Sequence, residues 1–368
     1  MIYKTPPING TTVRLLKELD ALRGALGDKT GVETPWLGRL RREWRASAAS
    51  SSIEIEGFHV PPEEAVALSS GQEPADPNDE HRMALSCYGR AMDHVGVMSD
   101  DPHFRWVDRV ILDLHFDACY FQKDKDPGQY RVGPVSVTSP QGGSLAYLGP
   151  PYEEVPALMG EVAEWLEHGD LEAHVVVRAA MAHLHLVSVH PFNDGNGRVS
   201  RILQSLVLAR GGLLTPEFLS IEEYLGENTQ DYYATLEAVQ AGSYQPERDA
   251  GPWVEFCVQA HIDQARRRSE QLTEAAKRWS FLEDLVEQRG WPDRLVIALE
   301  QSLFQGVDRA SYVAEAAVSQ PTASNDLRRL LDAGLVARQG SGPSTRYRAS
   351  AQLSEDVRKA VAEPDLKA

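Results

Sequence analysis

Apolar residues recur every three or four positions along most of this chain, and short polar or glycine-rich stretches interrupt them. Over residues 11–26, for example, Val13, Leu16 and Leu19 share one face of a helix. Similar spacing, or an apolar run without breakers, predicts helices at residues 37–55, 82–97, 106–121, 155–167, 171–188, 201–210 and from 251 towards 290. The acidic, proline-containing stretch 72–80 predicts a surface loop. The pattern therefore predicts a mainly α fold.

One segment changes to the alternation of a β-strand. Residues 135–138 alternate apolar and polar side chains, residues 140–143 read Pro-Gln-Gly-Gly, and residues 145–147 are apolar again. Two short strands joined by such a turn predict a β-hairpin.

The last part of the chain, residues 291–368, differs in charge from the rest. It holds ten Arg and Lys residues against ten Asp and Glu residues, while the whole chain carries a formal net charge of −17. The order of elements expected there is a helix at 312–317, a short turn, a helix at 322–331 and a glycine-rich hairpin at 338–348. This order resembles a winged helix-turn-helix domain with its wing tip at 340–344.

Two kinds of partner stay open for such a domain. The side chains that could contact DNA phosphates are Arg328, Arg329, Arg338, Arg346 and Arg348. Thr322 and Asn325 could face a groove, but Asp326 lies on the same helix and the segment has no net positive charge. Winged helices also bind proteins, so a DNA partner and a protein partner are both expected candidates.

Composition sets further limits. Hydrophobic residues make up 42% and charged residues 25% of the chain, as in ordinary soluble globular proteins. The net charge of −17 argues against unspecific nucleic-acid binding and against anionic membranes. There is no run of 18 apolar residues and no signal-peptide pattern at the N-terminus. Cys87, Cys119 and Cys257 are far apart, which predicts buried free thiols in a reducing cytosol and thus a cytoplasmic protein. A homo-oligomer is possible.

The stretch 190–201, His-Pro-Phe-Asn-Asp-Gly-Asn-Gly-Arg-Val-Ser-Arg, carries the candidate chemistry. It lies between two predicted helices, and its Asn, Asp and Gly residues tolerate left-handed backbone geometry. A tight turn at a helix N-terminus gathers N–H groups into an anion site. Arg198 and Arg201, three apart, share a helical face and can reach the same anion. Asp194 suits a hard cation such as Mg²⁺, and His190 is placed as a general base.

These residues match every fixed position of the H-x-F-x-[D/E]-G-N-G-R-x-x-R signature, so residues 190–201 resemble the active-site loop of Fic-domain proteins. The resemblance covers about residues 1–265. It implies a Fic-type helical core with a small hairpin flap. The expected division is an N-terminal helical region at 1–105, the core at 106–265, a helical linker at 266–290 and the winged-helix domain at 291–368.

The end of the predicted helix 37–55 has a second resemblance. Ser52 and Glu56 are four apart on one helical face, and Gly57 is suited to cap the helix. Alone, this is a common helix end. Together with the loop at 190–201, it resembles the inhibitory [S/T]-x-x-x-E-[G/N] helix of many Fic proteins. A Glu56 carboxylate paired with Arg198 would occupy the guanidinium expected to hold the γ-phosphate of ATP.

Two further segments gain roles from the resemblance. Asn228, Tyr232 and Tyr233 match a segment that closes the adenine pocket, although adjacent tyrosines are often packing residues. The hairpin at about 135–147 corresponds to the flap, which holds a segment of the target protein by strand addition.

The expected activity is transfer of AMP from ATP to a Tyr, Thr or Ser hydroxyl of a target protein. His190 would take the proton, Asp194 would hold Mg²⁺, and Phe192 would anchor the loop. The remaining expected phosphate ligands are Asn193, Gly195, Asn196, Gly197, Arg198 and Arg201. Three alternatives stay open: hydrolytic removal of AMP from a modified protein, with Glu56 orienting water; a DNA-binding regulator whose Fic site only senses nucleotide; and transfer of another phosphate-containing group.

Overall fold

A computed structural model describes residues 1–30, 34–138, 145–213, 220–304, 306–340 and 345–362. Its contacts divide the chain into two compact units. Unit 1 comprises Met1–Asp28 and Arg41–Arg267, and unit 2 comprises Lys29–Leu40 and Arg268–Ala368. The candidate catalytic loop lies in unit 1.

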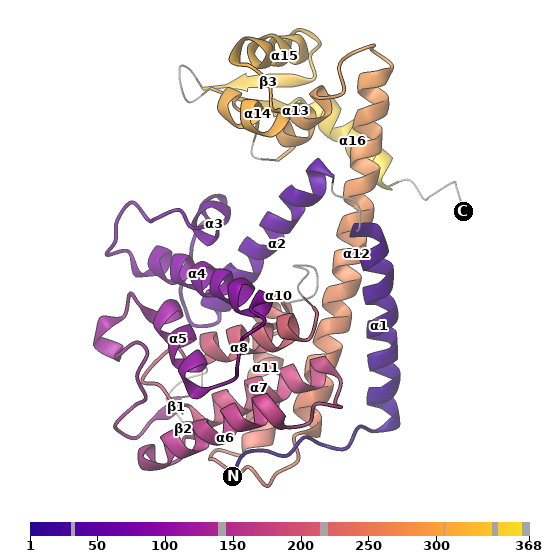
Figure 1. Cartoon of the computed structure of the whole chain (residues 1–368). Coiled ribbons are helices and arrows are strands. Elements are labelled where there is room, and N and C mark those ends of the chain that lie inside the picture. Colours follow the sequence, from indigo (N-terminus) through magenta and orange to yellow (C-terminus); the bar gives the residue numbers. More distant parts are fainter. Residues whose placement is uncertain (31–33, 139–144, 214–219, 305, 341–344, 363–368) are drawn as a thin grey trace. The chain divides into compact units, whose positions relative to one another are not determined.

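Two helices that pack closely together, α7 (Val175–Val189) and α8 (Asn196–Arg210), form the centre of unit 1 (Figure 1). The helices α4 (Glu80–Asp100) and α5 (Asp108–Cys119) pack against α8. Nearly every side chain of α7 is buried, because this helix is apolar on all sides. The loop between α7 and α8 is therefore held by two rigid, fully packed helices.

The remaining helices of unit 1 surround this pair. They are α3 (Pro62–Ser69), α6 (Val155–His168), α10 (Glu222–Glu227), α11 (Thr229–Gln240) and the short η1 (Lys123–Lys125) and η2 (Tyr152–Glu154). Three helices have residues in both units: α1 (Gly10–Thr30), α2 (Pro35–Glu54) and α12 (Gly251–Glu287). The sequence pattern did not predict α3, which begins at a proline and spans only two turns.

The predicted hairpin is present in unit 1. β1 (Ser136–Thr138) pairs antiparallel with β2 (Leu145–Leu148), and Val137 lies opposite Tyr147. The predicted turn at 140–143 lies outside the described residues. On its far side β2 is held to the chain after α11, because the Leu148 N–H donates to the Gly242 carbonyl at 3.0 Å. The prediction of a mainly helical fold with a small two-stranded hairpin is confirmed.

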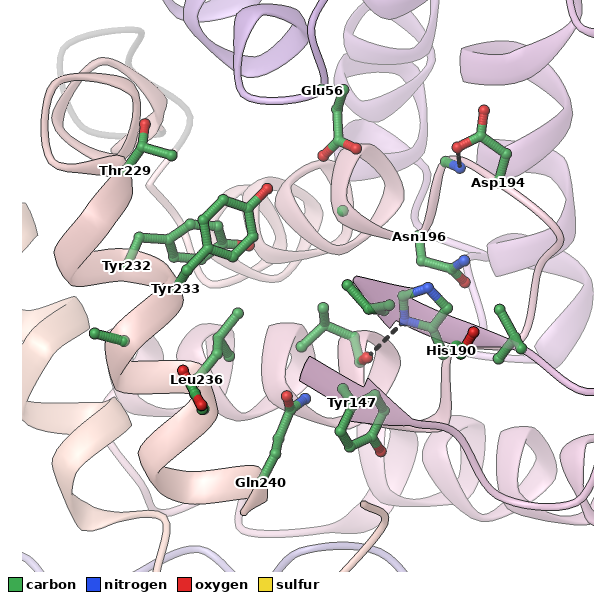
Figure 2. Close-up of a pocket in the computed structure, with 18 of the residues that line it drawn as sticks. Glu56, Tyr147, His190, Asp194, Asn196, Thr229, Tyr232, Tyr233, Leu236 and Gln240 are labelled. Atoms are coloured by element: carbon green, nitrogen blue, oxygen red, sulfur yellow. Dashed lines mark hydrogen bonds between the residues drawn. The ribbon is translucent and has the colours of Figure 1, made fainter. Parts of the chain in front are cut away.

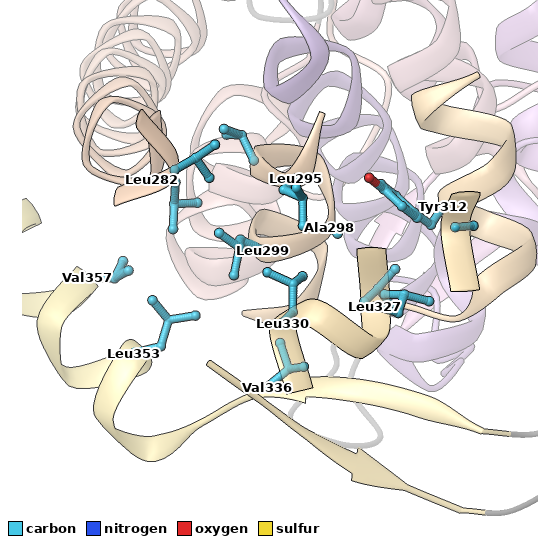
Figure 3. Close-up of a cluster of buried hydrophobic side chains, with 14 residues drawn as sticks. Leu282, Leu295, Ala298, Leu299, Tyr312, Leu327, Leu330, Val336, Leu353 and Val357 are labelled. Carbon is cyan, nitrogen blue, oxygen red and sulfur yellow. The ribbon is translucent and has the colours of Figure 1, made fainter. Parts of the chain in front are cut away.

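Unit 2 has its own hydrophobic core. Its elements after α12 are α13 (Leu295–Ser302), α14 (Arg309–Ala316), α15 (Gln320–Asp332), β3 (Val336–Gln339), β4 (Arg346–Ala349) and α16 (Ala351–Ala362). The core side chains labelled in Figure 3 are Leu282, Leu295, Ala298, Leu299, Tyr312, Leu327, Leu330, Val336, Leu353 and Val357. The sequence pattern predicted α14, α15 and the β3–β4 hairpin, but not α13 and α16.

One acidic side chain of unit 2 lies differently from the expectation. Asp326 was expected as a negative charge on the same exposed helix as the candidate DNA contacts, but the residue is only 3% exposed. Its carboxylate accepts hydrogen bonds from Arg294 Nε at 2.7 Å and from the Tyr312 hydroxyl at 3.1 Å. The negative charge of Asp326 is thus neutralised inside the unit, and the exposed face of α15 does not present it.

Two global expectations can be compared with the described residues. None of their helices combines the length and apolarity needed to cross a bilayer. Cys87, Cys119 and Cys257 are all buried and free, as their spacing predicted.

Candidate active site

The loop between α7 and α8 borders a pocket of about 650 Å³ (Figure 2). His190 ends α7 in the left-handed region, with φ 50°, and Gly195 precedes α8 with φ 78°. These two residues with left-handed backbone geometry let the chain turn between two closely packed helices. The pocket is lined by Glu56, Val135–Val137, Tyr147, Val187, His190, Asn193–Gly197, Thr229, Gln230, Tyr232–Ala234, Leu236, Glu237 and Gln240. The loop, the hairpin and α11 thus meet at one site.

The His190 imidazole is held in the form that a general base needs. Its Nδ1 lies 3.1 Å from the Val187 carbonyl, which can only accept, so Nδ1 carries the proton. Nε2 is then left with its lone pair. Burial lowers the pKa of His190, although its bond to the Val187 carbonyl acts in the opposite direction. The imidazole is therefore neutral near pH 7 and able to accept a proton.

Asp194 and Arg198 are joined by a residue that the sequence pattern did not reveal. Gln122 donates from Nε2 to the Asp194 carboxylate at 2.6 Å and accepts from Arg198 Nη2 at 2.8 Å. Arg198 also reaches the Asp194 carboxylate at 3.3 Å. Because Gln122 lies just after α5 and far from the loop in sequence, no spacing rule marks it.

The predicted contact between Glu56 and Arg198 is wrong. Glu56 instead accepts a hydrogen bond from Arg201 Nη2 at 2.8 Å. Arg198 and Arg201 diverge, because the 60° offset between residues three apart sends one guanidinium towards Asp194 and the other towards α2. Ser52 completes the contact, since its hydroxyl accepts from Arg201 Nε at 2.7 Å and its carbonyl accepts from Nη2 at 2.9 Å.

The Glu56 carboxylate also lies over the first turn of α8. A methyl group added to Gly197 would collide with this carboxylate. The first turn of a helix has backbone N–H groups without intrahelical acceptors, and it attracts negative charge. Figure 2 shows Glu56 pointing into the pocket that His190 and Asp194 also border. Gly57, with φ 86°, ends the turn after α2 and does not line the pocket.

The interior of the loop is fixed by hydrogen bonds of the Asn196 side chain and by the packing of two rings. Asn196 accepts from the Phe192 N–H and donates to the Phe192 carbonyl, both at 2.9 Å. Phe192 is fully buried, as predicted, and stacks on His115 with ring centroids 3.7 Å apart. His115 Nδ1 accepts from the Gly128 N–H, so its Nε2 donates to the Asp194 carbonyl at 3.1 Å. Asn196 thus orders the loop in addition to bordering the pocket.

The two tyrosines of α11 differ in their surroundings. Tyr232 is 1% exposed and its hydroxyl lies 3.1 Å from His183 Nε2, so it is part of the core. Tyr233 is partly exposed and its ring projects into the pocket (Figure 2). Asn228 is not among the pocket-lining residues, because its side-chain amide donates to the Tyr224 carbonyl at 2.8 Å. Asn193 lines the pocket and donates to Asp126 at 3.2 Å.

The side chains of the loop can be compared with the ligands that a Mg²⁺ ion requires. Among the described residues no cluster of three or more His, Cys, Asp or Glu side chains could form a metal site of protein ligands alone. Mg²⁺ bound with a nucleotide commonly takes one or two carboxylates and completes its shell with phosphates and waters. Asp194 lines the pocket and its side chain is 35% exposed, which fits this mode.

Comparison with known proteins defines the class of this domain. Residues 105–208 match the sequence profile of the Fic/DOC family. This segment is therefore a Fic domain.

Two relatives and one solved structure extend the comparison. The chain is 28% identical over 190 residues to protein adenylyltransferase fic-1 of Caenorhabditis elegans, covering 51% of this chain and 33% of that protein. It is 28% identical over 186 residues to a uridine 5'-monophosphate transferase of Xanthomonas campestris pv. campestris, covering 48% of this chain and 34% of that protein. The aligned part thus spans about a third of each relative. A Fic family protein from Desulfovibrio desulfuricans G20 has a similar fold, with a TM-score of 0.61 and 22% identity, over 95% of this chain and 99% of that chain.

Proposed function

We propose that this chain transfers AMP from ATP to a hydroxyl side chain of a protein. The observation that carries the proposal is the neutral His190 imidazole, with its free Nε2 in the same pocket as an anion-binding helix N-terminus and the Asp194 carboxylate. Relatives that are named protein adenylyltransferases support the same reaction class.

The residues of the loop have separate roles in the proposed reaction. His190 Nε2 accepts the proton of the attacking hydroxyl, whose oxygen forms a bond to the α-phosphorus. The bond from this phosphorus to the bridging oxygen breaks, and pyrophosphate leaves with that electron pair. The N–H groups at the start of α8 bind the phosphate oxygens, and Arg198 and Arg201 supply positive charge behind them. Proton transfer and positioning are thus both supplied by this loop.

Asp194 would hold Mg²⁺ together with the phosphates of the nucleotide. The ion supplies neutralisation of phosphate charge when it is bound. Gln122 and the Gly195 N–H donate to the Asp194 carboxylate at 2.6 and 2.7 Å and so fix the orientation of this side chain.

Glu56 keeps the enzyme inactive in this proposal. Its carboxylate occupies the α8 N-terminus and a donor of Arg201, and both are needed for a triphosphate. ATP bound beside Glu56 would meet a like charge, and its α-phosphorus would be misaligned.

The β1–β2 hairpin would receive the target protein. Among the described residues β1 pairs only with β2, so the other edge of β1 is open to an added strand. Val135, Ser136 and Val137 line the pocket, so a strand added there brings its side chains next to His190.

Two labelled nucleotides test this proposal. With the Glu56→Gly variant and Mg²⁺, label in the α-phosphate of ATP should enter protein, and label in the γ-phosphate should not. Transfer of γ-label would identify a kinase reaction. Absence of both labels from the protein would contradict the proposed transferase activity. Release of AMP from a protein already modified, under the same conditions, would identify hydrolysis instead.

UMP transfer is a second candidate, supported by the Xanthomonas relative that is named a UMP transferase and is as similar to this chain as fic-1. Equimolar ATP and UTP, each labelled at the α-phosphate with a different isotope, separate the two reactions. Preferential labelling from UTP would show that the transferred group is UMP and not AMP.

For the winged-helix domain predicted in unit 2 we propose DNA as the partner. Burial of Asp326 against Arg294 removes the negative charge that argued against it. Arg328, Arg329, Arg338, Arg346 and Arg348 are all exposed on α15, β3 and β4. Retarded migration of a duplex at low salt tests this proposal, and no retardation at any salt concentration would favour a protein partner.

A further inference from the structure

Arg131 makes an unusual set of contacts beside the candidate active site. It is only 2% exposed. Its Nε donates to the His190 carbonyl at 2.8 Å, its Nη1 to the Gly133 carbonyl at 2.8 Å and its Nη2 to the Pro150 carbonyl at 2.6 Å. One side chain thus bonds three separate segments of the backbone.

These segments have related positions. Gly133 precedes β1 and Pro150 follows β2, so both ends of the hairpin are bonded to the same guanidinium. The third segment carries His190, whose backbone has the left-handed geometry described above. The backbone N–H of Arg131 adds a further bond to the Pro191 carbonyl at 2.9 Å. Because the guanidinium is planar and rigid, it fixes the directions of these carbonyls relative to one another.

The hairpin approaches this guanidinium without space for another side chain. A Cβ atom added to Gly149 would lie 2.8 Å from Val135 Cγ1, 3.2 Å from Arg131 Nη2 and 3.7 Å from His190 Cβ. Gly149 therefore permits direct contact between the end of β2, the guanidinium and the candidate base.

Packing alone would not favour a cation here. A buried charge is costly unless it is paired or fully hydrogen-bonded. Among the described residues no carboxylate lies within ion-pair distance of Arg131, and carbonyl oxygens are its acceptors. An apolar side chain would fill the volume, but it would leave those carbonyls unpaired and the hairpin unconnected to His190.

We propose that Arg131 is a positioning residue that holds the β1–β2 hairpin in register with the His190 imidazole, so that a hydroxyl presented on the hairpin reaches Nε2. This inference rests on the proposed function. Arg131 does not contact the nucleotide site, since it is not among the residues that line the pocket. Its loss should therefore affect transfer to a hydroxyl more than nucleotide binding.

The charge of Arg131 acts in the same place. Burial is the main cause that lowers the pKa of His190, and the Arg131 cation lowers it further, while Glu56 and Asp194 raise it. The neutral Tyr147 ring also faces His190, with ring centroids 6.5 Å apart. Replacing Arg131 by a neutral residue should raise the pKa of His190, whereas lysine should keep it close to the original value.

The test compares Arg131→Gln and Arg131→Lys in the Glu56→Gly background. The matched control is Arg109→Gln, at an α5 arginine whose side chain is 70% exposed. The measurements are ATP affinity by calorimetry, the single-turnover rate of self-modification at saturating ATP, hydrogen exchange of residues 145–150, and the His190 pKa by NMR. We expect ATP affinity near that of the control, a rate about 10²-fold lower and faster exchange at 145–150. Lysine should restore the pKa but not the rate, because one ammonium cannot bond three divergent carbonyls.

Two results overturn the proposal. One is a rate for Arg131→Gln equal to that of the control. The other is a loss of rate matched by a loss of ATP affinity, which would show general damage. If Arg131→Gln does not fold, Gly149→Ala decides, since it keeps Arg131 but displaces the end of β2 and should lower the rate similarly. If even the Glu56→Gly parent transfers nothing, the proposed function fails, while exchange at 145–150 still tests Arg131, and unchanged exchange overturns its role.

Discussion

Replacing Glu56 with glycine should raise the rate of AMP incorporation about 10- to 150-fold. The Glu56 carboxylate accepts from Arg201 Nη2 at 2.8 Å, and the two side chains are 22% and 1% exposed. A hydrogen bond between charged groups contributes about 1.5–3 kcal/mol. ATP can still bind beside Glu56, but its triphosphate is aligned for transfer only where Glu56 is displaced, so only molecules with Glu56 displaced are competent for transfer. A contact of that strength leaves roughly one molecule in ten to one in 150 competent, and the glycine variant removes this limit.

The assay is incorporation of α-labelled AMP into the protein itself. Wild type, Glu56→Gly, Glu56→Gln and Glu56→Gly/His190→Ala are compared at equal protein concentration. Glu56→Gln keeps the size and one acceptor oxygen but not the charge, so its rate should lie between those of wild type and Glu56→Gly. Glu54→Gly is the matched control, because Glu54 is exposed at the end of α2. The rate should rise more than the affinity for ATP. If wild type labels as strongly as Glu56→Gly, Glu56 is not an inhibitor and residues 52–57 only end a helix.

Three further outcomes are expected. In the Glu56→Gly background, His190→Ala should lower transfer by about 10²–10⁴-fold and leave ATP affinity nearly unchanged, because the imidazole handles a proton and not the phosphates. Labelling and calorimetry check this, and equal labelling with and without His190→Ala would contradict it. Burial lowers the pKa of His115 to about 4, below its unfolded value. The unfolded chain therefore binds the proton first, and about 3 kcal/mol of stability should be lost as the pH falls from 7 to 4. Urea unfolding should show that the free energy of unfolding depends less on pH in His115→Gln. An unchanged dependence would show that His115 is not the group responsible. If unit 2 binds DNA, Arg348→Ala in the full chain should reduce the slope of log affinity against log salt by about one. Retardation assays at several salt concentrations measure this slope. An unchanged slope would show that Arg348 does not contact DNA phosphates.

The helical core and the loop could be predicted because their signals are local. Residues 190–201 contain the turn residues, the candidate base His190 and the candidate metal ligand Asp194 in one stretch, and the structure brings them to one pocket. Which arginine Glu56 contacts is not local. Arg198 and Arg201 are indistinguishable by spacing, and the choice depends on how α2 packs against α8 and where Gln122 lies.

Other features were missed for different physical reasons. Gln122 and Arg131 bond groups that are distant in sequence. The acceptors of Arg131 are backbone carbonyls, which every residue has, so no residue type in the sequence marks them as its partners. α16 has Leu353 and Val357 four apart, a signal that could have predicted it. α13 is short and apolar on most sides, so its periodicity cannot distinguish a helix from a strand.

Intact-mass spectrometry of the Glu56→Gly protein, incubated with ATP and Mg²⁺, tests the transfer of AMP most directly. The account predicts a mass increase equal to one AMP group, located on a Tyr, Thr or Ser side chain and absent from Glu56→Gly/His190→Ala. A mass equal to that of the untreated protein, or the same increase in the double variant, would contradict it.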